Sequence, residues 1–275
     1  MLNLLTVFIP KYGLTHILVV LFFPLLAIVS YFIFKKKSEK SKVIYLYILM
    51  AIAFIGTWLT FFTALAQDYN HQRANFFARL PLHMCSINVI LYPLFFFLRN
   101  KVKPLIRSTL FAYMYFFGSA GALLAMVVTA PGDCIGANIN FFQYNVFMYW
   151  LKHGLIFILP ILFVVLGFYK PTIKDIFKSV VFIIILLCIM ECVNLLFTYL
   201  NQHVTHGTDI ANFFYTRTGK GTAVLEAFYN FLPYELLYMF PLVIIAVPIF
   251  FIYYLPFFIF NLIQKKQLKK KNISV

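Results

Sequence analysis

Charged side chains are scarce in this sequence, and acidic ones most of all. Only 11% of the 275 residues are charged, and 8 of these are Asp or Glu. A soluble globular domain carries about a quarter charged residues and about half apolar ones, whereas 63% of this chain is hydrophobic. The composition therefore excludes a soluble globular domain.

Cysteines with the spacing of a metal or redox site are also missing. The four cysteines, Cys85, Cys134, Cys188 and Cys192, form no CxxC motif, so neither a disulfide framework nor a zinc site is expected. Cys188 and Cys192 lie one helical turn apart in an apolar run, where cysteine behaves as a small hydrophobic residue. We therefore expect no metal and no cofactor.

The positive charge lacks the pattern of a nucleic-acid-binding protein. The net charge is +15, but most of the 23 Lys and Arg sit in short clusters between apolar segments, not along one face with exposed aromatic residues. Such clusters are typical of topology signals and of contacts with lipid headgroups. We expect membrane lipids, and no nucleic acid, as partners.

Apolar runs long enough to cross a membrane recur along the whole chain. A hydrocarbon core of about 30 Å needs roughly 20 apolar helical residues. The sequence therefore predicts an all-α membrane protein, a bundle of seven transmembrane helices in one integral membrane domain over residues 1–275 with a basic cytoplasmic tail at 261–275. The predicted spans are 14–34, 43–65, 80–98, 106–128, 143–169, 174–200 and 233–260.

The connections between these spans alternate in positive charge. The first holds five Lys and Arg, the third four, the fifth three and the tail five, whereas the second holds two, the fourth none and the sixth two in about thirty residues. Connections rich in Lys and Arg stay in the cytoplasm. We therefore expect the N-terminus outside and the C-terminus in the cytoplasm.

Polar residues gather in the outer halves of the predicted spans, where they are expected to line a cavity. In the fifth span, Lys152 and His153 lie roughly 13–15 Å below the outer end, and in the sixth span Glu191 lies at a similar depth. Lys152 or His153 is therefore expected to meet Glu191. Charges inside a membrane typically mark a pathway or a site, and the alternative is an ion pair that only joins two helices. The expected cavity or substrate-binding residues are Asn88, Gln143, Asn145, Tyr149, Lys152, Glu191, Asn194 and Glu235.

The segment RLPLHMCSINVI at 79–90 places reactive side chains at the entry of the third span. His83 and Cys85 are two residues apart, about 200° on a regular helix, so they face apart unless the helix begins after them. If Cys85 is a nucleophile, its general base is more reasonably supplied by another span than by His83, and His153 is the candidate for that role. The candidate catalytic residues are thus Cys85, His83 and His153. The alternative is an inert packing cysteine.

Four different short motifs lie between the start of the third predicted span and the sixth. They are LPLHMCS at 80–86, GSAG at 118–121, FFQ at 141–143 followed by His153-Gly154, and the region around Asn194. Together they resemble the YwaF-type family of bacterial seven-span integral membrane proteins over about residues 10–258. The resemblance implies a seven-span bundle in a bacterial cell membrane.

That family is, more remotely, similar to an animal seven-span family assigned as an ether-phospholipid acyltransferase. A membrane cysteine and a histidine are considered important there, which implies Cys85 with His83 or His153 in this chain. The resemblance favours an acyltransferase or transacylase that modifies a lipid or a lipoprotein. The alternatives are a small-solute transporter or receptor-like protein, whose intramembrane charges would serve coupling, and a membrane scaffold without enzyme activity.

Overall fold

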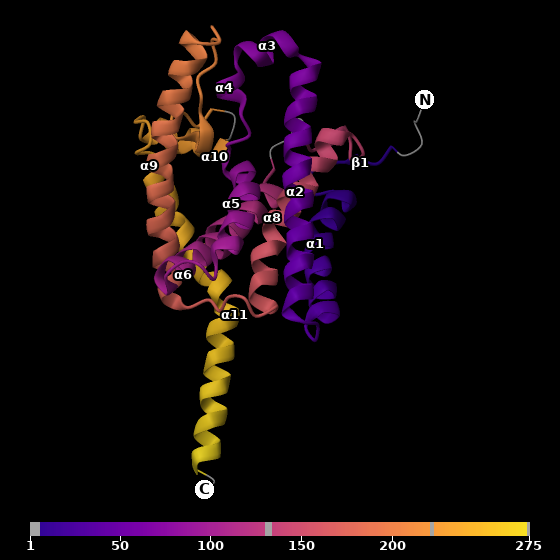
Figure 1. Cartoon of the computed structure of the whole chain (residues 1–275), viewed down its shortest axis with the longest axis vertical. Helices are drawn as coiled ribbons and strands as arrows, with labels where there is room; N and C mark the ends of the chain where they lie inside the picture. Colours follow the sequence, from indigo (N-terminus) through magenta and orange to yellow (C-terminus); the bar gives the residue numbers. More distant parts are fainter. Residues whose placement is uncertain (1–5, 130–133, 221–222, 274–275) are drawn as a thin grey trace.

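The computed structural model describes residues 6–129, 134–220 and 223–273, and it is mostly helical (Figure 1). Within these ranges, six helices are long and apolar enough to cross a membrane. The protein is therefore a helical, multi-pass membrane protein. The six helices are α1 (Leu14–Phe34), α2 (Glu39–Gln67), a continuous helix over Pro104–Val127, α8 (Tyr144–Val165), α9 (Ile173–His203) and α11 (Met239–Ile273), of which Met239–Ile259 is the apolar part.

The third predicted span is shorter than expected. Helix α5 (Met84–Leu98) has 15 residues and rises about 22 Å, less than a hydrocarbon core of about 30 Å. Its start is later than predicted because a residue before proline is driven out of the helical conformation. Leu80, which precedes Pro81, has a ψ of 146°. Seven spans and the orientation of the termini therefore stay predictions.

The helix over Pro104–Val127 contains a π-helical segment. It consists of α6 (Pro104–Ala112), the π-helix η1 (Tyr113–Ser119) and α7 (Ala120–Val127). Two carbonyls of α7 accept hydrogen bonds from other helices. The Tyr149 hydroxyl donates to the Ala125 carbonyl at 2.9 Å, and His16 Nε2 donates to the Met126 carbonyl at 2.8 Å.

Tyr92 of α5 packs directly onto η1. Its hydroxyl donates to the Met114 carbonyl at 3.3 Å. A Cβ on Gly118 would collide with the same hydroxyl. Gly118, the first residue of the GSAG motif, thus permits a close contact between α5 and η1.

Short elements that the sequence did not predict occupy the connections. A two-stranded antiparallel sheet joins the N-terminal segment to the segment before α8, so the chain is not purely α-helical. These elements are β1 (Phe8–Ile9), α3 (Tyr69–Ala74), α4 (Phe76–Arg79), β2 (Gly136–Asn140), the 3-10 helix η2 (Phe213–Tyr215) and α10 (Ala223–Phe231).

One end of the bundle carries the connections 35–38, 99–103 and 166–172, which together hold seven Lys and Arg residues, and we call it the basic end. Beyond it, the C-terminal part of α11 projects past the other helices (Figure 1). The opposite end, which we call the polar end, carries α3, α4 and the segments 204–220 and 223–238 (Figure 1). The first, third and fifth connections between the predicted spans thus lie at the same end of the bundle.

Helix α8 lies at the centre of the bundle, between α1, α2, η1 and α7. This position explains why it is buried over most of its length, including Trp150 at 1% exposure. Two predicted boundaries were wrong at the polar end. Helix α9 continues to His203 instead of ending at 200, and α11 begins at Met239 instead of 233. Leu236, with a φ of 61°, lies in the turn that delays α11.

Candidate functional site

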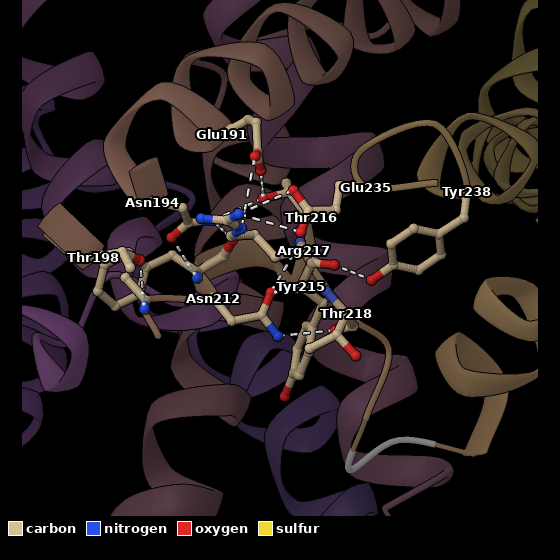
Figure 2. A network of polar contacts seen from close by, with 12 residues as sticks. Glu191, Asn194, Thr198, Asn212, Tyr215, Thr216, Arg217, Thr218, Glu235 and Tyr238 are labelled. Carbon is tan, nitrogen blue, oxygen red and sulfur yellow. Dashed lines mark hydrogen bonds and ion pairs between the residues drawn. The ribbon is translucent and has the colours of Figure 1, made fainter. Parts of the chain in front are cut away.

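A polar network lies at the polar end, where the segment 212–218 folds against α9 and the turn before α11 (Figure 2). Arg217 is its centre. Its Nη2 lies 3.1 Å from Glu235 Oε2, and its Nε lies 3.9 Å from Glu191 Oε1. Thr216 Oγ1 donates to Glu191 Oε2 at 2.5 Å. The predicted pairing of Glu191 with Lys152 or His153 was therefore wrong, because a connection of the chain supplies the cation.

Asn194 of α9 fixes this segment in place. Its amide nitrogen donates to the Phe213 carbonyl at 2.9 Å and to Thr216 Oγ1 at 2.7 Å, and its amide oxygen accepts from the Phe213 N–H at 2.8 Å. The side chain is fully buried. Since a buried amide must be hydrogen-bonded to be tolerated, Asn194 binds the connection to the bundle.

The backbone of the segment is strained beside these contacts. Phe214 and Tyr215 have φ values of 59° and 58°, in the left-handed region that costs a non-glycine residue roughly 1–3 kcal/mol. Asn212 holds the following turn because its amide oxygen accepts from the Arg217 N–H at 3.0 Å. The Tyr238 hydroxyl donates to the Tyr215 carbonyl, as Figure 2 shows. Such strain gathers where a segment positions functional groups.

The same segment covers the entry of α5. The His83 ring lies with its centroid 5.6 Å from the rings of both Phe213 and Tyr215. His83 precedes the first residue of α5 and is exposed. The segment thus joins the polar network to the region predicted to be reactive.

We call the group of His83, Cys85, Ser86 and Lys152 the thiol site. Lys152 Nζ donates to Ser86 Oγ at 3.2 Å, and the ammonium lies within electrostatic range of both Cys85 and His83. In the part of the chain that the structure describes, no carboxylate lies within 4.0 Å of Lys152. The lysine is therefore a cation without a carboxylate partner, next to a thiol.

Several tyrosines lie in the neighbourhood of the half-buried thiol. Cys85 is within electrostatic range of four of them, Tyr92, Tyr113, Tyr149 and Tyr215. The Tyr113 hydroxyl donates to Asn88 Oδ1 at 2.6 Å, so Asn88 binds one of these four tyrosines. Burial raises the pKa of Tyr215, which lies outside the spans, so its phenol stays neutral.

His153 is buried and turned toward its own helix. Its Nδ1 lies 2.7 Å from the Tyr149 carbonyl. A carbonyl only accepts, so Nδ1 carries the proton and Nε2 keeps a lone pair. Among the hydrogen bonds of the described residues, neither His83 nor His153 contacts the Cys85 sulfur. The structure thus forms no preassembled Cys–His pair.

The remaining predicted residues lie in two different places. Glu191, Asn194 and Glu235 belong to the polar network. Gln143 and Asn145 are exposed at the start of α8 and belong neither to the polar network nor to the thiol site. Sequence reasoning missed Arg217 and Tyr215. Arg217 is one of only two basic residues in the sixth connection, and that scarcity was the one signal that could have singled it out.

The fold and the site define a multi-pass helical membrane protein with a layer of polar residues at one end of its bundle. Residues 11–254 match the model of the TMEM164 family, so the chain belongs to the TMEM164 family. The matched range contains both the thiol site and the polar network. No curated protein and no solved structure matches the chain. Membership of the YwaF-type family and a bacterial cell membrane stay predictions.

Proposed function

We propose that this protein is a membrane acyltransferase that carries the acyl group on Cys85. The observation that carries this proposal is Lys152, a cation without a carboxylate partner among the described residues, beside a half-buried thiol. The resemblance to an acyltransferase family that relies on a membrane cysteine and a histidine supports the same assignment.

Two features near Cys85 stabilise a thiolate against the cost of burying its charge. Cys85 is the second residue of the 15-residue helix α5, where unpaired backbone N–H groups produce a partial positive charge. Lys152, when protonated, adds a positive charge within electrostatic range of the thiol. Cysteines at helix N-termini and next to lysine are the ones that become nucleophilic thiolates.

The proposed reaction has two steps with one covalent intermediate. His83 takes the thiol proton, and the Cys85 thiolate attacks the carbonyl carbon of an acyl ester. A C–S bond forms, the ester C–O bond breaks, and the leaving lysolipid oxygen takes the proton from the histidine. A hydroxyl or amine of the acceptor then attacks the thioester, its proton passes to His83, and the C–S bond breaks. His83 suits this role better than the buried His153 because its ring is exposed.

The thioester is the species to detect. Purified protein in lipid nanodiscs that contain a phospholipid with an isotope-labelled acyl chain is expected to gain one acyl mass on Cys85. Hydroxylamine at neutral pH is expected to release this mass, because thioesters react where ordinary esters do not. Peptide mass spectrometry is the measurement. Cys188, which is exposed on α9, serves as the internal control, and labelling of Cys188 alone would contradict the proposal.

The proposal also places the thiol site toward the outer leaflet. In a variant without the four native cysteines, Val204→Cys at the polar end is expected to react with a membrane-impermeant maleimide added to intact cells. Lys36→Cys at the basic end is expected to react only after the cells are permeabilised. Both native side chains are exposed, so burial does not separate them. The reverse pattern would show that the thiol site faces the cytoplasm.

A further inference from the structure

Two neighbouring cavities lie at the basic end, on the side of the bundle opposite the thiol site. Their volumes are about 810 Å³ and about 310 Å³. Both are lined by Arg107, Gly167 and Phe168, so they share a wall, and we call the two together the recess. Nothing in the proposed acyl transfer uses this recess.

Four cationic side chains line the recess. Arg107 and Lys170 line the larger cavity, and Lys42 and Arg99 line the smaller one together with a single carboxylate, Glu39. Among the residues that the structure describes, none of the four cations lies within 4.0 Å of a carboxylate. The recess is therefore lined by four cationic side chains and one carboxylate, so positive charge is in excess.

Backbone carbonyls hold two of these cations in place. Arg107 Nη2 donates to the Phe168 carbonyl at 3.1 Å, and Lys42 Nζ donates to the Leu166 carbonyl at 3.4 Å. Between these carbonyls lies Gly167, whose φ of 92° is in the region that side chains rarely adopt. The turn at Gly167 thus presents both carbonyls and orders the cations before any ligand binds.

The larger cavity is also apolar. Helices α8 and α11, which both cross the membrane, provide Val164, Pro256 and Phe257, and Phe168 and Tyr169 complete the wall. The Tyr169 hydroxyl donates to Asp175 at 3.0 Å, so its polar end is already bound. Cations beside an apolar wall at the ends of membrane helices match a molecule that has a charged head and a hydrocarbon chain.

We propose that this recess binds a phospholipid with an anionic headgroup. The phosphate lies between Arg107 and Lys170, and one acyl chain follows the wall formed by Val164, Pro256 and Phe257. A free phosphate would use the cations but leave the apolar wall without a partner. Basic recesses between membrane helices are recognised sites for acidic lipid headgroups.

Native mass spectrometry of the detergent-purified full chain tests this site. Phosphatidylglycerol and phosphatidylcholine are titrated in parallel, and the wild type is expected to bind phosphatidylglycerol more tightly. The variant Arg107→Gln/Lys170→Gln is expected to lose about tenfold or more in phosphatidylglycerol affinity, because each cation near the membrane surface contributes a comparable share. Lys170→Gln alone guards against misfolding, since this exposed side chain lies at the edge of the recess.

The matched control is Lys101→Gln/Lys103→Gln. It removes the same charge from the same end, from exposed residues that line neither cavity. An equal loss of affinity in this control would overturn the proposal in favour of a diffuse basic surface. Displacement of the lipid by millimolar inorganic phosphate would also overturn it, as would equal binding of phosphatidylcholine. The outcome does not depend on whether Cys85 carries an acyl group.

Discussion

Replacing Cys85 by alanine is expected to lower acyl transfer by at least about 10³-fold, because a covalent route has no substitute for its nucleophile. The measurement is the rate at which the purified protein, in vesicles, moves a labelled acyl chain from a phospholipid to a lysophospholipid. Cys85 is only half-buried, so the variant is expected to fold and to melt near the wild-type temperature. The loss would then report chemistry and not stability.

Two further variants sharpen this experiment. Cys188→Ala removes an exposed thiol from α9 and is expected to leave the rate unchanged. Lys152→Met is expected to slow the reaction, and Lys152→Arg is expected to restore part of the rate, because arginine keeps the positive charge near Cys85. If Cys85→Ala transfers acyl chains at the wild-type rate, the thioester route is wrong, and transport becomes the leading reading.

Replacing Glu191 by alanine is expected to reduce the free energy of unfolding by about 2–4 kcal/mol. Removal of one partner from a buried ion pair costs roughly 3–5 kcal/mol, and this pair is slightly less than fully buried, with side-chain exposures of 14% for Glu191 and 18% for Arg217. The change also takes the acceptor away from Thr216. Thermal unfolding in detergent, compared with the wild type, is the measurement.

Glu235→Ala is the matched control because Glu235 also binds Arg217 but is 50% exposed. Exposed ion pairs contribute about 1 kcal/mol or less, so this variant is expected to melt close to the wild type. Equal losses from the two variants would refute the view that Glu191 is the structural partner of Arg217. A coupling between Glu191 and Lys152 in a double-mutant cycle would restore the pairing that the sequence suggested.

The membrane helices could be predicted well because hydropathy and length determine them. The span predicted at 14–34 has the bounds of α1, and the span predicted at 106–128 overlaps nearly all of the helix Pro104–Val127. In both, a mostly apolar stretch is bounded by charged or turn-forming residues, so the boundaries of the helix can be located from the sequence. Boundaries moved where proline or a left-handed residue intervened, as at Pro81 and Leu236.

The partners of the polar residues could not be predicted in the same way. The sequence gives the depth of Glu191 in the membrane, but not the direction in which its helix is rotated or which connection folds back to meet it. Arg217 lies 26 positions away in a connection whose backbone includes two left-handed residues, Phe214 and Tyr215. The composition of this connection does not predict that its backbone folds back and brings Arg217 to Glu191. Lys152 was predicted to need an acid, and the structure instead places it beside Cys85 and Ser86.

The π-helix η1 has a consequence for how the length of this chain can change. A π-helical turn accommodates about one residue more than an α-helical turn, so η1 absorbs an extra residue locally and leaves α6 and α7 in nearly the phase of a continuous α-helix. This phase directs the carbonyls of Ala125 and Met126 toward Tyr149 and His16. Deleting one residue within Tyr113–Ser119 and thereby converting η1 to α-helix is expected to keep these two contacts, whereas deleting one residue between Ala120 and Leu124 of α7 would rotate both carbonyls by about 100° relative to α6 and break them.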